Sequence, residues 1–195
     1  AYGTVRMAGS LIYVESTDDD EFLHMIFAVA GHEINSFESF LINEDSVSID
    51  GDGFVTTEKY VSGDTKYIRL KTHTGADDQL ADTDLVDESD GKWTTNHRLR
   101  GIAYIYARLK FSNDIFPNGI PNISAIIQGK KVYDPRTTTT EYSANSALCL
   151  RDYLTNTRYG LGAKTSEIND TSFTTGANVC DETVTLETPR TKSFN

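Results

Sequence analysis

Cysteine is scarce in this sequence, and its scarcity limits how the chain can be stabilised. The 195 residues include two cysteines, Cys149 and Cys180, which are too few and too far apart for a disulfide framework or a zinc knuckle. Free thiols, made in a reducing compartment, are therefore the expected state. The residues predict no cofactor and no metal site.

Long apolar runs and targeting signals are also lacking. The chain has no run of about 18 apolar residues, no basic segment leading into an apolar one, and no lipidation signature. These absences predict a protein without stable membrane insertion. The chain starts at Ala1 without a methionine and stops at Asn195 without a closing signal, so we expect a piece of a longer polypeptide.

Basic residues are in the minority. The chain has 18 Lys and Arg against 29 Asp and Glu, a net charge of −11 and a pI near 4.7. Sequence-specific nucleic-acid binding is therefore not expected, because that affinity rests on neutralising phosphates. The charge is also uneven: residues 1–95 carry −14, residues 96–164 carry +6, and residues 165–195 carry −3. Either solvated faces differ in sign, or acidic and basic faces meet within a chain or between neighbouring copies.

The motifs of common enzymes are incomplete or missing. There is no G-x-S-x-G elbow, and no two of the four histidines have the spacing of a zinc-binding helix. Residues 160–165 resemble part of a phosphate loop but follow a predicted helix, where a phosphate loop follows a strand. Paired carboxylates for glycoside hydrolysis stay open as an alternative, since 29 acidic residues offer many pairs.

Residues 48–59 resemble a calcium-binding EF-hand loop without its two strongest ligands. Asp50 and Asp52 fit the pattern, but Ser48 stands where an Asp is expected and Lys59 where a bidentate Glu must sit. We therefore predict a tight β-turn with acidic residues at its tip. Weak calcium binding near Asp50 and Asp52 is left as an alternative.

The chain does have enough apolar residues for a real core, at 38% with 10 Tyr and 9 Phe. Its length fits one elaborated domain or two small ones. Short segments rich in β-branched and aromatic residues predict strands over 22–29, 39–42, 67–73, 102–111, 123–128 and 130–133. Segment 100–111 carries apolar residues at both sets of alternate positions, so both of its faces are expected to be covered.

Three short helices are predicted. The best supported runs over about 143–158, where Ser143 or Asn145 can cap its start, and Ala147, Leu150 and Leu154 recur at helical spacing. Gly160 and Gly162 follow the helix, at positions where a residue in the left-handed backbone conformation can end it. The others cover 77–86 and 171–181, the latter placing Ala177 and Cys180 on one side. The fold class is therefore α+β, predominantly antiparallel β with about three short helices.

Two local features each have two interpretations, one structural and one functional. Trp93 near the acidic residues 87–90 anchors a loop on a sheet or, alternatively, forms a platform on which a sugar stacks. Asp134-Pro135-Arg136 forms a pinned corner between sheet and helix or, alternatively, a catalytic Asp–Arg pair without an accompanying nucleophile. Gly129 permits a tight link between two β segments.

Several short motifs occur in an order and spacing that are specific. They are Trp93-Thr94, Arg100-Gly101-Ile102-Ala103-Tyr104, Gly119-Ile120-Pro121, Gln128-Gly129-Lys130-Lys131-Val132-Tyr133-Asp134-Pro135-Arg136, Tyr142-Ser143-Ala144-Asn145, Asp152-Tyr153-Leu154 and Tyr159-Gly160-Leu161-Gly162. Together with segments 30–34, 78–81 and 177–182, they resemble the central tail hub of long-tailed bacteriophages, the J-type tip attachment family. The resemblance spans most of the chain.

The resemblance implies a structural, non-enzymatic protein of a phage or prophage virion. Such a hub closes the distal end of the tail tube, forms a threefold ring of mixed β domains, and connects the tube to host-recognition parts. The implied partners are further copies of the chain, as a homotrimer, and other tail proteins. The implied location is the virion tail tip, after synthesis in the bacterial cytoplasm. J-type proteins are far longer, and the downstream domains that determine host attachment are missing here.

In this interpretation residues 1–135 are the mainly β hub region, and residues 136–195 are a helical and irregular C-terminal region, truncated relative to the parent protein. No catalytic residue is assigned. The structural or interface candidates are Trp93, Gly129, Asp134, Pro135, Arg136, Asp152, Tyr153 and Gly160. Two alternative functions are a carbohydrate- or receptor-binding adhesin and a tail-associated peptidoglycan hydrolase.

Overall fold

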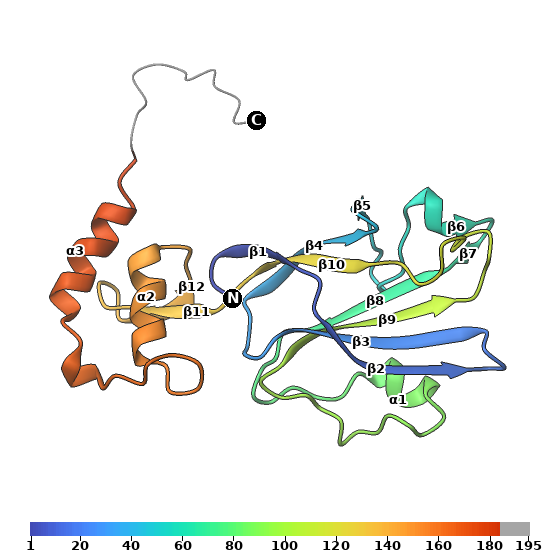
Figure 1. The fold of residues 1–195 in the computed structure, drawn as a ribbon, viewed down its shortest axis with the longest axis horizontal. Helices are drawn as coiled ribbons and strands as arrows, with labels where there is room; N and C mark the ends of the chain where they lie inside the picture. The colour runs from blue at the N-terminus through green and yellow to red at the C-terminus, as the bar shows by residue number, and fades with distance from the viewer. Residues whose placement is uncertain (184–195) are drawn as a thin grey trace, which may run out of the picture. The chain divides into compact units, whose positions relative to one another are not determined.

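The computed structural model describes residues 1–183, and the chain divides into two compact units, Ala1–Lys131 and Val132–Asn195. The first unit holds β1 (Thr4–Met7), β2 (Ser10–Thr17), β3 (Phe22–Ala30), β4 (Ser36–Ile42), β5 (Asp45–Val47), β6 (Val61–Ser62), β7 (Thr65–Lys66), β8 (Ile68–His73), α1 (Thr83–Glu88), β9 (Ala103–Lys110) and β10 (Ile123–Gln128). β11 (Lys131–Asp134) crosses the division, and β12 (Thr139–Tyr142), α2 (Ser146–Thr155) and α3 (Asp170–Cys180) follow (Figure 1).

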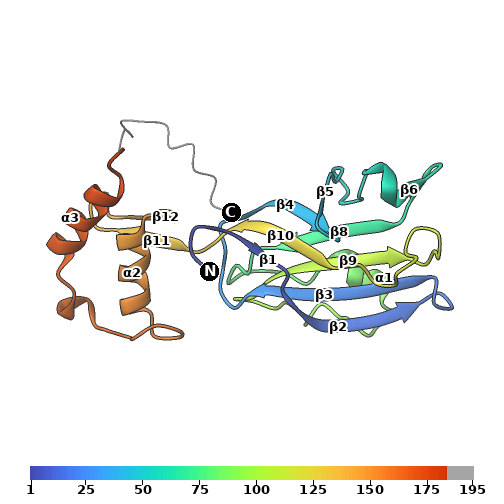
Figure 2. The same ribbon diagram turned by 45° about the horizontal axis from the view of Figure 1, so that its top comes forward.

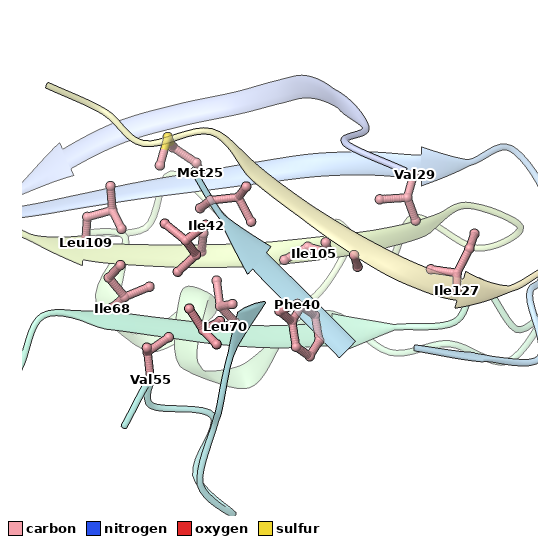
Figure 3. Packing of buried hydrophobic residues seen from close by; sticks show 14 of the residues in the cluster. Met25, Val29, Phe40, Ile42, Val55, Ile68, Leu70, Ile105, Leu109 and Ile127 are labelled. Atoms are coloured by element: carbon pink, nitrogen blue, oxygen red, sulfur yellow. The ribbon is translucent and has the colours of Figure 1, made fainter. Parts of the chain in front are cut away.

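The first unit is a sandwich of two four-stranded sheets. One has the order β1-β10-β4-β5 and the other β2-β3-β9-β8, and neighbouring strands in both are antiparallel. Their facing sides bury one apolar core, to which Met25 and Ile105 contribute from one sheet and Ile42 and Ile127 from the other (Figure 3). Every second side chain of a strand points into this core. Residues that face the core therefore alternate along each strand with residues that face away from it.

The β2-β3-β9-β8 sheet is buried on its second face as well. Ile26, Tyr104 and Tyr106 point away from the main core and pack with Leu85 of α1 and Trp93 of the following loop. The first five residues of β9 are therefore all buried. This accounts for the two apolar faces predicted for segment 100–111.

The predicted fold class is confirmed: residues 1–183 form an α+β fold with mainly antiparallel sheets and three α-helices. Each of the six predicted strand segments overlaps a strand. The unpredicted β2 is exposed along most of its length, so its sequence lacks the alternation that burial of one face imposes.

The boundaries and faces of the helices differ from the prediction. α1 starts only after Asp82, whose carboxylate accepts a hydrogen bond from the backbone N–H of Leu85 at 2.9 Å. The preceding residues stay in a loop because the side chain of Gln79 accepts from the N–H of Gly75 and donates to the carbonyls of Arg98 and Leu99. A side chain that replaces backbone partners in this way competes with helix formation.

The helix predicted over about 143–158 is present as α2, but its buried residues are not those at the predicted helical spacing. Leu148 and Arg151 are the buried residues, whereas Leu150 is 51% exposed. Arg151 is buried because its guanidinium pairs with Asp170 at 2.7 Å and lies over the ring of Tyr133, so its charge is neutralised. In α3, Ala177 is buried but Cys180 is exposed, so these two residues do not share a packed side.

Candidate functional site

The second unit is organised around the guanidinium of Arg136, which follows β11. Its Nε and one terminal nitrogen donate to both carboxylate oxygens of Asp134, at 3.0 and 2.7 Å. Its other terminal nitrogen donates to Asp181 at 2.8 Å and to Asn178 at 3.0 Å, at the end of α3. Arg136 thus joins a hairpin to a helix that lies far along the sequence, in the bidentate geometry that guanidinium favours.

A second polar side chain extends this cluster to α2. Asn145 caps the start of α2 by accepting from the N–H groups of Ala147 and Leu148. The amide nitrogen of Asn145 donates to the carbonyl of Ala177 at 2.9 Å and to Asp181 at 2.8 Å. The cluster of Asp134, Arg136, Asn145, Asn178 and Asp181, here called the arginine clamp, therefore connects the β11–β12 hairpin, α2 and α3.

The charges of the arginine clamp stabilise one another. Hydrogen bonds from Arg136 hold the pKa values of Asp134 and Asp181 below their usual range. The same bonds raise the pKa of Arg136. Because Nε and both terminal nitrogens of Arg136 have acceptors in the protein, the cluster is arranged to hold elements together rather than to bind a ligand.

Pro135 does not lie at a corner between sheet and helix, as the sequence predicts, but in the turn between β11 and β12. The N–H of Thr138, with φ +59°, closes this turn on the carbonyl of Asp134 at 2.8 Å. Proline suits the position because its fixed φ and missing N–H end strand pairing.

The candidates Asp152, Tyr153 and Gly160 meet where α2 ends. The hydroxyl of Tyr159 donates to Asp152 at 3.1 Å, and the N–H of Leu161 donates to the carbonyl of Tyr153 at 3.1 Å. The loop after α2 thus folds back and satisfies carbonyls that the helix leaves free. A Cβ on Gly160 would lie 1.9 Å from the oxygen of Tyr153, so glycine is required by close approach rather than as a left-handed helix end.

Trp93 and Gly129 lie in the first unit. The Trp93 side chain is 6% exposed, edge-on to Tyr13 and stacked on His97, with ring centroids 4.9 and 4.7 Å away. In this position the indole packs its loop on the sheet and offers no open face to a sugar. The N–H of Gly129 donates to Gly3, and a Cβ there would lie 2.5 Å from the oxygen of Ala1.

A polar network between α1 and the outer face of the β2-β3-β9-β8 sheet escaped the sequence analysis. Glu88 accepts from Arg69 at 2.6 Å, from Arg108 at 2.9 Å and from the hydroxyl of Tyr106 at 3.3 Å. Burial works to raise the pKa of Glu88, but the bonds from Arg69 and Arg108 outweigh it and leave that pKa lowered. No local sequence motif predicts this network, because its members come from three separate segments, β8, α1 and β9.

The turn that resembles an EF-hand loop uses its first acidic residue internally. The Asp50 carboxylate accepts from the N–H groups of Asp52 and Phe54, at 3.0 and 2.9 Å, and from Lys66 at 2.6 Å. Within residues 1–183 no group of three or more His, Cys, Asp or Glu side chains is placed to hold a metal ion. Across the same residues no helix is long and apolar enough to cross a membrane.

Comparison with known proteins gives the class of the chain. No family model matches it. A curated protein does: the chain is a distant homologue of a phage baseplate hub protein, which confirms the resemblance to the phage tail hub.

That relative is the baseplate hub protein pb3 of Escherichia phage T5, 27% identical over 209 aligned positions that include 82% of this chain. The chain spans 22% of the length of pb3. Among solved structures, a chain of the virion of the native gene transfer agent particle aligns with a TM-score of 0.45 and 18% identity, over 65% of this chain and 25% of that one.

Proposed function

We propose that this chain is part of the baseplate hub of a phage or prophage tail and acts by assembly rather than catalysis. The observation that carries the proposal is the homology to a baseplate hub protein, which extends over 82% of the chain. In this role it closes the distal end of the tail tube and connects the tube to host-recognition parts. Its partners are further copies, as a trimer, and other tail proteins.

The buried polar contacts of the protein favour a structural role. The buried Arg69 and Arg151 each pair with a carboxylate of another element, and the arginine clamp joins three elements of the second unit. Such internally paired polar clusters fix elements in place and leave few groups directed at a substrate.

The two alternative functions have less support. An adhesin that binds sugars through Trp93 needs an open indole face, and Trp93 is buried. A glycoside-type hydrolase needs a carboxyl group whose pKa is raised so that it can act as an acid. The described carboxyl groups with clearly displaced pKa values, such as Asp82 and Glu88, are displaced downward.

Immunogold electron microscopy of particles from an induced culture of the source strain tests the proposal. We expect antibody raised against this chain to label the distal tail tip, with pre-immune serum as the control. Labelled cell envelope beside bare particles would overturn it. In that case a glycan array and a zymogram would test the adhesin and hydrolase functions.

A further inference from the structure

β2 is an edge strand with an unusually apolar surface. It lies at one end of the β2-β3-β9-β8 sheet, and among the strands of residues 1–183 it pairs only with β3 (Figure 2). Leu11, Ile12 and Val14 are 53%, 47% and 52% exposed. An edge strand presents unpaired N–H and C=O groups, and natural proteins usually protect such an edge with charge, proline or a covering segment.

Two of these side chains stand on the side of the sheet that faces the core. In the register of β2 and β3, Leu11 is opposite Phe27 and Val14 is opposite Met25, and both partners pack in the main core. The opposing sheet ends on this side at β1, which has four residues. It leaves Leu11 and Val14 largely uncovered, so the sandwich is open along β2.

The open side continues into a groove of about 490 Å³ at the end of β2. Ser16 of β2, Leu23 of β3 and Leu109 of β9 line it, with Phe111 and Ile120 at its rim, 67% and 61% exposed. The apolar surface of β2 and this groove therefore lie next to each other along one edge of the unit.

The same end of β2 is strongly acidic. The turn to β3 consists of Asp18, Asp19 and Asp20, all exposed and all with positive φ, followed by Glu21. Glu21 pairs with Lys110 at 3.0 Å, and Asp20 accepts from Ser16 at 2.6 Å. The residues of β2 itself include Glu15 and no Lys or Arg, so pairing with β2 of a second copy would leave this acidic turn without a complement, whereas a basic segment would complement it.

We propose that the free edge of β2 and the adjoining groove accept an extended segment of another protein as a fifth strand of the sheet. The segment is apolar at alternate positions, to pack beside Leu11 and Val14, and basic at the end that meets Asp18–Asp20. All pairings in this sheet are antiparallel. An antiparallel segment starts at the acidic turn, so its basic residues precede its apolar ones.

A peptide-binding experiment on the full chain tests this proposal. The probe is a fluorescein-labelled peptide in which two lysines precede four Thr-Val repeats, and the control is the same peptide with two glutamates. Polarisation should show saturable binding of the lysine peptide, at least about tenfold tighter than the glutamate peptide at low salt. Hydrogen exchange should slow at the backbone amides of Ser10–Thr17.

Matched variants locate the binding. Val14→Lys places a charge on the edge and should weaken binding of the lysine peptide at least about tenfold. Val179→Lys, at a valine of α3 that is 59% exposed, should leave the binding unchanged. The double variant Asp18→Asn with Asp19→Asn should weaken binding of the lysine peptide several-fold. Asparagine tolerates positive φ, so only the charge is lost.

Four results would overturn the proposal: no binding at 1 mM peptide, equal binding of both peptides, no effect of Val14→Lys, or self-association of the chain that Val14→Lys abolishes. The last result would assign the edge to a second copy. This inference does not depend on the proposed function, because the peptide experiment needs no virion and immunogold labelling does not involve β2.

Discussion

Gly160 shows how a single residue decides whether the end of α2 can form. The chain folds back there so closely that a side chain would overlap the carbonyl oxygen of Tyr153. The motif Tyr159-Gly160-Leu161-Gly162 could be found in the sequence, but the reason for its glycine could not. That reason is an approach between two backbone segments, which only the folded loop contains.

Gly160→Ala should therefore destabilise the second unit. Relieving the overlap requires the loop or the helix end to move, which we expect to cost about 2–3 kcal/mol. Thermal unfolding followed by the helical circular dichroism signal at 222 nm measures it. Gly51→Ala is the matched control, since a Cβ at Gly51 meets nothing within 4 Å. Equal midpoints for the two variants would contradict the prediction.

Asp134→Asn should destabilise the chain in a pH-dependent way. It removes the charge that Nε and one terminal nitrogen of Arg136 contact, and we expect a loss of about 2 kcal/mol at pH 7. Arg136 lowers the pKa of Asp134 in the folded state, so this stability is present above the unfolded pKa and is lost as the pH falls through the folded one. The difference between the two proteins should shrink below about pH 4.

Urea unfolding of both proteins at several pH values checks this. Glu141→Gln, in the exposed part of β12, is the control and should match the parent chain throughout. A constant difference down to pH 3 would show that Asp134 acts through packing rather than charge.

Among the elements, α1 is held mainly by its tertiary contacts. It has six residues, too short to be stable alone, and it places Leu85 in the apolar cluster and Glu88 between two arginines of the sheet. The sequence predicted a helix here but not its start. Nor did it show that Glu88 neutralises the buried Arg69.

Glu88→Gln should loosen α1 from the sheet. The amide keeps the shape of the side chain but leaves Arg69, 7% exposed, without its shortest ion pair, and we expect a loss of about 2 kcal/mol. The fluorescence of Trp93, the single tryptophan, reports unfolding beside α1. Asp87→Asn, at an exposed position of the same helix, should change little. A larger effect from Asp87→Asn than from Glu88→Gln would refute this account.

For the whole molecule, the distribution of charge bears on assembly. Residues 1–95 carry −14 and residues 96–164 carry +6. If copies associate head to tail in a ring, acidic and basic faces alternate around it, and the attraction is screened by salt.

We therefore expect association of the chain to weaken as salt rises. Sedimentation velocity at a series of protein concentrations should give a dissociation constant that increases about tenfold or more between 50 and 500 mM NaCl. Sodium sulfate at matched ionic strength provides the control for ion-specific effects. A trimer whose dissociation constant does not respond to salt would show that attraction between acidic and basic faces does not drive its association.

The sequence by itself determined what is local. Runs rich in β-branched and aromatic residues gave segments that overlap six of the strands, the cap candidates Ser143 and Asn145 gave the start of α2 to within a few residues, and ordered motifs gave the resemblance that homology confirms. Only the tertiary structure decided which face of α2 is buried, which distant partners Arg136 and Glu88 meet, and that the apolar side chains of β2 stay uncovered. The physical reason is that periodicity and capping depend on neighbours a few residues away, whereas burial and ion pairing depend on segments brought together only when the chain folds.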